Sequence, residues 1–154
     1  MITIDPIDKK ILMILQINSK TSNADIAREV GMAPSAVFER IKKMEEKGII
    51  KSYNAHLNAK LVGQGLLAFV LVRTESKQTE VSTGKLLAEL PEVLEAHHIA
   101  GEDCYLLKVR TEDTESLGHL LEDTFRQIGS VISTKTTIVL NTIKETNQIK
   151  ISQE

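Results

Sequence analysis

The residues best suited to binding chemistry lie on one side of a predicted helix that begins at Pro34 and ends before Gly48. At about 3.6 residues per turn, its apolar stripe consists of Val37, Ile41 and Met44. The opposite side carries Ser35, Glu39, Lys42 and Lys43, flanked by Ala36 and Arg40. Cationic side chains bind phosphate oxygens, and polar side chains near a helix start reach base edges in the major groove of a duplex. The pattern therefore indicates a DNA-contacting helix, with an ordinary solvated amphipathic helix as the alternative.

The elements before this helix favour DNA over that alternative. Ser22 and Asp25 form a capping-box pattern at the start of a short helix. The inward side of the short helix consists of Ile26, Ala27 and Val30. Gly31 then permits a sharply turned backbone, so that only residues 31–33 separate the two helices. Two short helices joined by so tight a turn, over residues 21–50, are typical of a helix-turn-helix.

A further helix and a strand complete the predicted head of the chain. Asp5 and Pro6 suit a helix start, because one can cap the helix and the other can occupy its first turn. The apolar residues of this helix recur at spacings of three and four: Ile7, Ile11, Ile14 and Leu15. Residues 49–57 are predicted to form one or two short strands, a candidate wing or hinge. Residues 58–65 contain two glycines and no periodicity, which places a domain boundary there.

Composition limits the classes of protein to which a chain of 154 residues can belong. The first 60 residues have a net charge of +3 and the remaining 94 a net charge of −5, which suits a basic DNA-binding head joined to a body with another role. The single cysteine, Cys104, excludes an internal disulfide. No secretory signal and no apolar stretch of about 18 residues is evident, so we expect a cytoplasmic protein without membrane contact. The scarcity of aromatic residues argues against a stacking surface for single strands.

The second half of the chain contains an internal repeat. The tetrapeptide Val-Arg-Thr-Glu ends an apolar strand at residues 72–75 and recurs at residues 109–112. Each copy precedes a helix and then another strand, which is entered through residues 91–93 in the first unit and 129–131 in the second. A repeated strand–helix–strand unit predicts a four-stranded sheet with two helices on one face, the ferredoxin-like arrangement.

Two elements of this half bear on function. A helix is predicted over residues 114–128, with an apolar stripe of Leu117, Leu121, Thr124 and Ile128. The last strand is predicted over residues 131–140, where Thr134 and Thr136 share a face with the apolar residues Ile132, Ile138 and Leu140. Threonine also favours strands for purely structural reasons, so both a binding role and a structural role are open for these two residues.

The predicted organisation is α+β in two domains. Residues 1–58 form a winged helix-turn-helix domain with its hinge strand, and residues 59–65 form a linker. Residues 66–145 form a ferredoxin-like βαββαβ domain for sensing and assembly, and residues 146–154 form a C-terminal tail.

In their order and spacing, these motifs make nearly the whole chain resemble the Lrp/AsnC transcription regulators, also called feast/famine regulators. In the head the resemblance is carried by Asp8, Ile11-Leu12, Asp25-Ile26-Ala27, Val30-Gly31, Pro34-Ser35, residues 40–45 and Gly48-Ile49-Ile50. In the second half it is carried by Pro91-Glu92-Val93, residues 101–105 and Thr134-Lys135-Thr136. The chain departs from the family at Ala33, where a Ser or Thr usually caps the recognition helix and contributes about 1 kcal/mol.

The resemblance implies double-stranded DNA as a partner. Base edges would be met by Ser35, Ala36, Phe38 and Glu39, and phosphates by Arg40, Lys42 and Lys43. Phe38 suits packing as well as it suits a base contact, and the sequence leaves both roles open. Members of the family read a pseudo-palindromic operator as two-fold dimers, and their sheet domain builds that dimer and higher assemblies, commonly of eight.

The resemblance also implies a small-molecule effector, usually an amino acid, bound between dimers, with no metal or other cofactor. The implied effector residues are Gly101, Glu102, Asp103, Tyr105, Thr134 and Thr136. The turn over residues 101–103 would bind a carboxylate through backbone donors, and Asp103 would accept a hydrogen bond from an ammonium group. Without the family, the same turn is an ordinary hairpin connection.

Two rival functions fit the same architecture. Siroheme decarboxylases share it, and His97 and His98 are candidate haem or metal ligands; neighbours in a strand point to opposite faces, however, so these two cannot converge on one ion. Cys104 has no indicated base and suits a buried strand thiol better than a nucleophile. The second rival is a sensor that no longer binds DNA, and the intact cationic side of the helix argues against it. We therefore expect a regulator rather than an enzyme.

Overall fold

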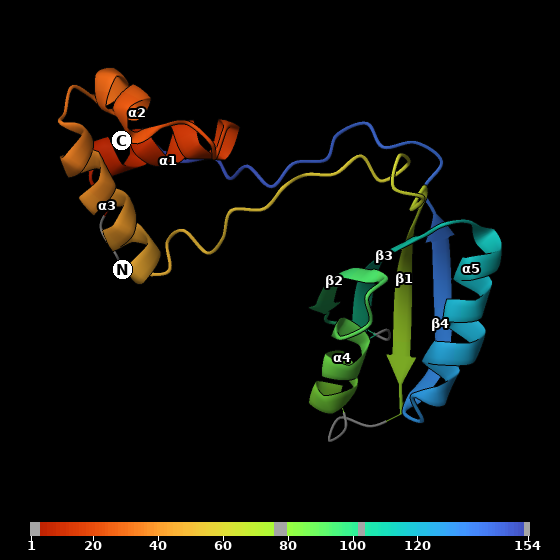
Figure 1. The fold of residues 1–154 in the computed structure, drawn as a ribbon. Coiled ribbons are helices and arrows are strands. Elements are labelled where there is room, and N and C mark those ends of the chain that lie inside the picture. Colours follow the sequence, from red (N-terminus) through yellow and green to blue (C-terminus); the bar gives the residue numbers. More distant parts are fainter. Residues whose placement is uncertain (1–3, 76–79, 102–103, 153–154) are drawn as a thin grey trace. The chain divides into compact units, whose positions relative to one another are not determined.

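The computed structural model describes residues 4–75, 80–101 and 104–152 (Figure 1). Contacts within the chain divide it into two compact units. The first unit comprises Met1–Ala55 together with Lys144–Glu154, and the second comprises His56–Ile143. Each unit has an apolar core of its own.

The first unit, the head, is built from three helices: α1 (Pro6–Ile17), α2 (Asn23–Val30) and α3 (Pro34–Glu46). The predicted caps are present, because Asp5 Oδ1 accepts the Asp8 N–H at 2.8 Å and Ser22 Oγ accepts the Asp25 N–H at 3.1 Å. Each cap satisfies a backbone donor that the helix itself leaves unpaired, so α1 and α2 begin where the sequence predicts. At the start of α3, Ala33 makes no such side-chain bond.

Left-handed glycines end α2 and α3. Gly31 has φ 70° and Gly48 has φ 68°, a conformation that is cheap only for a residue without Cβ. After Gly48, the Ile49 N–H donates to Met44 O at 2.9 Å, which closes the last turn of α3. Residues 31–33 alone separate α2 from α3, so the predicted helix-turn-helix is confirmed.

The head core takes one fully buried residue from each helix. Ile11 of α1, Ile26 of α2 and Val37 of α3 have no exposed surface, and Met44 packs beside them. Each of these residues belongs to the predicted apolar stripe of its helix. Burial of the three stripes against one another stabilises the packing of the helices.

The strand predicted over residues 49–57 is absent, and that prediction was wrong. Residues 51–58 have no regular secondary structure, and every side chain in that stretch is exposed. A strand requires a neighbour to complete its backbone hydrogen bonds, and the sheet in the described part of the chain does not include this stretch. Tyr53 and His56 supply local propensity without a buried face, which does not stabilise a strand.

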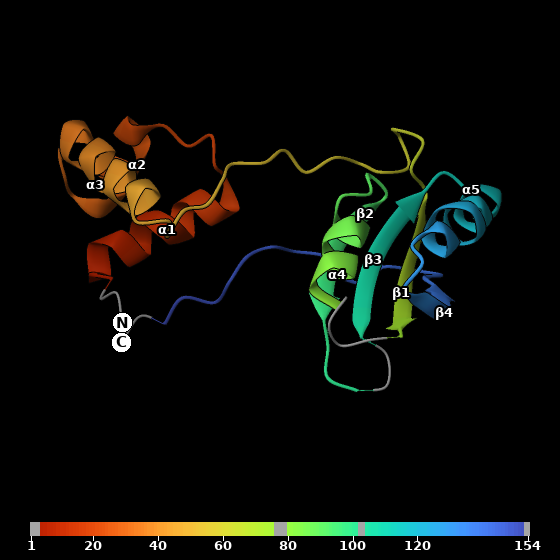
Figure 2. The same ribbon diagram turned by 90° about the horizontal axis from the view of Figure 1, so that it is seen from below.

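The second unit is a four-stranded antiparallel sheet with its helices on one face (Figures 1 and 2). Its elements are β1 (Leu66–Thr74), α4 (Glu80–Ala88), β2 (Val93–His98), β3 (Tyr105–Thr111), α5 (Thr114–His119), η1 (Leu120–Thr124), η2 (Phe125–Gln127) and β4 (Val131–Ile138). The strand order is β2-β3-β1-β4, and every neighbouring pair is antiparallel. The repeated strand–helix–strand units therefore form the predicted ferredoxin-like sheet.

The second helical region is less regular than predicted. It begins as the α-helix α5, continues as the π-helix η1 and ends as the 3₁₀-helix η2. The last strand ends at Ile138, two residues before its predicted end. Leu140 is almost fully exposed, so no burial favours a longer strand.

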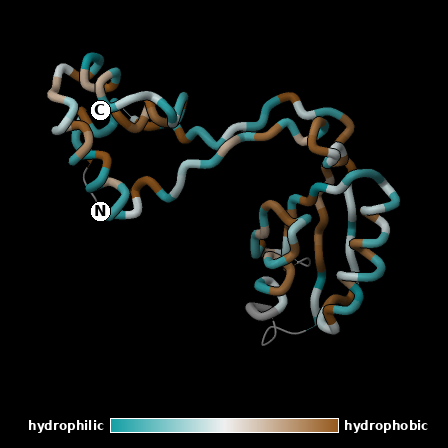
Figure 3. Tube along the Cα trace, in the orientation of Figure 1, coloured by the Kyte–Doolittle hydropathy of each residue, from teal (hydrophilic) through white to brown (hydrophobic). Residues whose placement is uncertain are grey.

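The core of the second unit lies between the sheet and its helices. It includes Val70, Val72, Leu107 and Val109 of the central strands, with Leu87 of α4 and Phe125 of η2. Figure 3 shows β1 as a strongly apolar run, which suits a central strand. The other face of the sheet carries Phe69, Leu71 and Leu106. No helix in the described ranges is both long enough and apolar enough to cross a membrane.

Candidate nucleic-acid interface and effector site

The outward side of α3 is a polar stripe with one aromatic residue. The stripe follows the spacing i, i+3, i+4 and i+7, and all of its members are exposed: Ser35, Phe38, Glu39 and Lys42. Phe38 is 51% exposed, so the head core does not use its ring. Of the two roles that the sequence leaves open for Phe38, packing within the head is therefore removed.

Arg40 is bound to the start of α1. Its Nη1 atom donates to Asp8 Oδ1 at 2.8 Å and to Asp5 Oδ2, and the side chain is 30% exposed. Arg40 thus holds α3 against α1, a role that the sequence analysis missed. The available signals were two acids three residues apart at the start of α1 and the position of Arg40 on the flank of α3. A phosphate contact of Arg40 stays a prediction.

The ion pairs of Arg40 with Asp5 and Asp8, the Arg40 bridge, shift the pKa values of Asp5 and Arg40 in favour of their charged forms. The Asp8 N–H and then the Arg40 guanidinium lower the pKa of Asp5 below its ordinary value. Hydrogen bonds to Asp5 and then to Asp8 raise the pKa of Arg40. Both partners are therefore charged at neutral pH, which keeps the bridge intact there.

The lysines of α3 are more available than Arg40. Lys42 Nζ is 4.0 Å from Glu46 Oε1, but both side chains are more than half exposed, so the pair contributes little. Lys43 is exposed next to it. Ala36 is half-buried near the start of α3, beside the stripe. Lys42 and Lys43 can therefore bind phosphates without breaking a packed contact.

The effector residues that the structure describes lie on separate elements of the sheet unit, and their role stays a prediction. Glu102 and Asp103 lie outside the described residues. Gly101 is exposed with φ 144°, a conformation that favours glycine. Thr134 is exposed and lies beside Val72 in the sheet register, and the Cys104 N–H donates to Val72 O at 2.9 Å. Thr136, half-buried, follows two residues further along β4.

Tyr105 is a core residue, and its contact with the effector stays a prediction. The residue is 4% exposed and lies on the helix-covered side of the sheet. Its ring packs under Gly84 of α4, where an added methyl group would lie 2.7 Å from Tyr105 Cε1. The ring of His98 is stacked at a tilt beside it, with centroids 5.2 Å apart. The strand pattern alone does not distinguish a buried tyrosine at the start of β3 from an exposed one.

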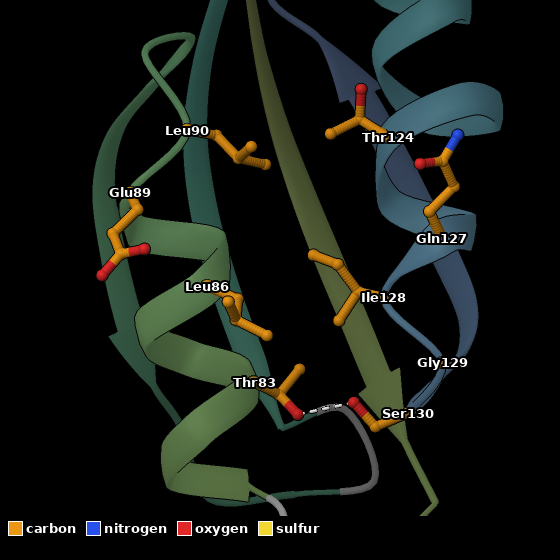
Figure 4. A pocket seen from close by; sticks show the side chains of 9 residues that line it. All are labelled: Thr83, Leu86, Glu89, Leu90, Thr124, Gln127, Ile128, Gly129 and Ser130. Carbon is orange, nitrogen blue, oxygen red and sulfur yellow. Dashed lines mark hydrogen bonds between the residues drawn. The ribbon is translucent and has the colours of Figure 1, made fainter.

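A cavity of about 620 Å³ lies between α4 and the η1–η2 region (Figure 4). Its walls are formed by Thr83, Leu86, Glu89, Leu90, Thr124, Gln127, Ile128, Gly129 and Ser130. At one end the hydroxyls of Thr83 and Ser130 are hydrogen-bonded at 2.5 Å. None of the predicted effector residues that the structure describes lines this cavity, which the sequence did not predict.

The two adjacent histidines face opposite sides of β2, as the sequence predicts. His98 pairs with Tyr105 on the helix-covered side, and His97 Nε2 lies 3.4 Å from Glu95 Oε2 on the other side. No group of three or more potential metal ligands occurs in the portion of the chain that is described. The two imidazole rings therefore point away from one another and do not converge on one ion.

The open face of the sheet combines apolar and charged groups. Phe69 of β1 lies opposite Lys108 of β3, and Lys108 Nζ donates to Glu95 Oε1 of β2 at 3.1 Å. This bond, followed by the His97 contact, lowers the pKa of Glu95.

Comparison with known proteins covers both units. One family model, described as a winged helix-turn-helix DNA-binding domain, matches residues 4–51, and another, described as the Lrp/AsnC ligand binding domain, matches residues 67–149. The HTH-type transcriptional regulator FL11 of Pyrococcus horikoshii is 38% identical over 151 residues, which are 97% of this chain and 98% of that protein. The leucine-responsive regulatory protein of Haemophilus influenzae is 38% identical over 147 residues, 94% of this chain and 88% of that protein.

A solved structure gives the same result. A transcriptional regulator of Neisseria meningitidis in complex with L-Met has a TM-score of 0.90 to this chain at 32% identity, and the match covers 96% of this chain and 97% of that chain. These matches cover both the head and the sheet unit, in the same order along the chain. The chain belongs to the Lrp/AsnC family of transcriptional regulators, with a DNA-binding helix-turn-helix head and a ligand-binding sheet domain.

Proposed function

We propose that this regulator reads double-stranded DNA by placing α3 in the major groove. The observation that carries the proposal is the exposed stripe of Ser35, Phe38, Glu39 and Lys42 on the helix that follows the tight turn. Ser35, Ala36, Phe38 and Glu39 meet base edges, and Lys42 and Lys43 neutralise phosphates. Arg40 orients α3 and presents its remaining guanidinium donors at the edge of the interface.

A salt titration with matched lysine variants tests this proposal. Duplexes are first selected from a random library with the full-length protein, and affinity is then measured between about 50 and 200 mM salt. Replacing both Lys42 and Lys43 with Ala reduces the slope of log affinity against log salt by about 2 per head, because two phosphate contacts are lost. The control replaces Lys10 and Lys20 of the same head, both also exposed, and leaves the slope unchanged. Equal effects of the two double variants refute the assignment of α3.

We also propose that the sheet domain binds an amino acid through residues 101–103 and through Thr134 and Thr136. Support comes from the ligand-binding family model and from the related regulator that was solved with L-Met. Thermal-shift measurements against the twenty amino acids, with L-methionine as the first probe, identify the effector. Asp103→Ala then leaves the protein folded and abolishes the effect of that amino acid on operator binding. An unchanged response removes Asp103 from the site.

Two copies are proposed to join through the open face of the sheet. Phe69, Leu71 and Leu106 supply apolar surface there, and burial of such a face stabilises a two-fold dimer. A dimer places two heads about 34 Å apart on a pseudo-palindromic operator. Higher assembly, to an octamer, is part of the same proposal. Sedimentation of Phe69→Asp tests it: the variant sediments as a monomer, whereas an unchanged dimer excludes this face.

We infer regulation rather than catalysis as the role of the sheet domain. The relatives that match the whole chain carry the names of regulators, and the geometry of His97 and His98 does not favour a tetrapyrrole site. A visible absorption spectrum of the purified protein, before and after addition of haem, checks this inference. A stoichiometric Soret band would support the enzyme alternative.

A further inference from the structure

The C-terminal segment of the chain packs on the head rather than on the sheet that precedes it. At the end of β4 the Val139 N–H donates to Leu67 O of the sheet at 2.9 Å. From Lys144 onward the chain belongs to the head unit. In Figure 1 the blue end of the chain lies beside α1. The chain therefore passes between its two units twice, once after Ala55 and once before Lys144.

Polar contacts fix the segment at one position along α1. The Ile149 N–H donates to Gln16 Oε1 at 2.6 Å, and Gln16 Nε2 donates to Ile149 O at 3.2 Å. Gln148 Nε2 also donates to Gln16 O at 3.2 Å. The Gln16 amide thus satisfies both backbone groups of Ile149, as a neighbouring strand would. Such a two-point contact sets the register of the segment on the helix.

An apolar contact accompanies the polar one. Ile151 is partly buried against the cluster that contains Ile11, Ile26 and Val37. Ile149, two residues earlier, is 76% exposed, although its backbone carries two of the hydrogen bonds. The two isoleucines therefore differ in burial, and only one contributes apolar contact to the head core.

We propose that residues 148–151 are a structural part of the head, a C-terminal strap that supports the recognition helix through α1. The strap holds the end of α1 at Gln16, and the start of α1 holds α3 through Asp5 and Asp8 bound to Arg40. The strap also tethers the sheet unit to the head a second time, through these non-covalent contacts. Its consequence for operator binding rests on the function proposed for α3.

Hydrogen exchange of the full-length protein tests the strap independently of DNA. The key pair is Ile151→Ser and Ile149→Ser, which make the same chemical change at a part-buried and an exposed position of one short segment. Ile151→Ser raises the exchange rate of α1 amides on the order of tenfold and leaves the sheet unchanged. Ile149→Ser exchanges like the wild type. Gln16→Ala, which removes the side-chain bonds and keeps the apolar contact, gives an intermediate increase.

The outcomes separate the strap from its alternatives. If Ile151→Ser and a chain that ends at Glu145 both exchange like the wild type in α1, the strap is overturned. If Ile151→Ser unfolds the head entirely, Gln16→Ala and the shortened chain still test the strap, through the exchange rate of the α1 amides. On a selected duplex, Ile151→Ser binds several-fold more weakly than Ile149→Ser. If even the wild type binds no duplex, the proposed function fails, while the exchange result still decides the strap.

Discussion

The Nη1 atom of Arg40 lies 2.8 Å from Oδ1 of Asp8, so a cationic residue of the recognition helix is bound to the first turn of another helix of the head. The same atom donates to Asp5, the cap of α1. One guanidinium therefore connects the start of α1 with the middle of α3, in addition to the apolar contacts between these helices.

Loss of the guanidinium is expected to destabilise the head modestly. Arg40→Ala lowers the free energy of unfolding by about 1 kcal/mol, because the pair is hydrogen-bonded but only part-buried. Urea unfolding measures the change. Lys43→Ala removes a charge from the exposed side of the same helix and shifts the free energy by less than about 0.5 kcal/mol. Equal effects of both variants would show that the bridge adds nothing to stability.

The pH dependence of the bridge follows from Asp5. Its pKa is lowered in the folded state, so its contribution to stability is present above the ordinary value of 3.8 and is lost as the pH falls through the lower folded pKa. Asp5→Asn keeps a side chain that can cap α1 but removes the charge. The variant is therefore less stable than the wild type near about pH 6, by about 0.5 kcal/mol after solvent screening, and the difference disappears as the pH falls through the lowered folded pKa of Asp5. A difference that persists in acid contradicts the assignment.

Phe38 is expected to affect DNA binding without affecting stability. Because the ring is 51% exposed, Phe38→Ala changes the free energy of unfolding by less than about 0.5 kcal/mol. Its affinity for a selected duplex falls about tenfold through loss of apolar contact with a base such as the thymine methyl group. Replacing each thymine of the duplex by uracil locates the contact: one replacement weakens the wild type and leaves Phe38→Ala unaffected. A large loss of stability would instead place the ring in an interface between copies.

The start of α3 can be improved by a cap. Ala33 occupies the cap position without a side-chain bond, so Ala33→Ser supplies an acceptor for the Ala36 N–H and raises the free energy of unfolding by about 1 kcal/mol. Ala33→Val, which supplies no acceptor and is as poor a cap as alanine, leaves it nearly unchanged. Thermal unfolding of the two variants makes the comparison. If serine behaves like valine, no capping bond forms.

The sheet unit contains a matched pair of helical glycines. A Cβ on Gly84 would lie 2.7 Å from Tyr105 Cε1, so Gly84→Ala forces the buried ring to move and destabilises the protein by about 1–3 kcal/mol. Nothing lies within 4 Å of the corresponding position on Gly118 in α5, so Gly118→Ala is neutral or stabilises by about 0.5 kcal/mol. Calorimetry of both variants measures the difference. Equal transition temperatures would show that Tyr105 adjusts freely.

Local sequence patterns were sufficient to predict the elements whose structure depends only on neighbouring residues. The caps at Asp5 and Ser22, the left-handed turns at Gly31 and Gly48, and the apolar stripes of the head all follow from interactions within a few residues. The repeat in the second half likewise determined the ferredoxin-like topology, because each strand–helix–strand unit must bury its apolar side on the same sheet. The sequence left open whether Phe38 packs in the head or contacts a base, because a helical wheel does not show how wide the buried side of the helix is.

The tertiary structure alone decided which distant groups meet. The two partners of Arg40 are 32 and 35 residues away from it in the chain. Tyr105 is buried where Gly84 of another element leaves room for its ring, and Gln16 binds a backbone 133 residues away. The strand expected after α3 failed for the same reason, since its hydrogen bonds needed a neighbour that local sequence cannot supply. Periodicity describes which side of an element is apolar, whereas contacts between elements depend on how the whole chain folds.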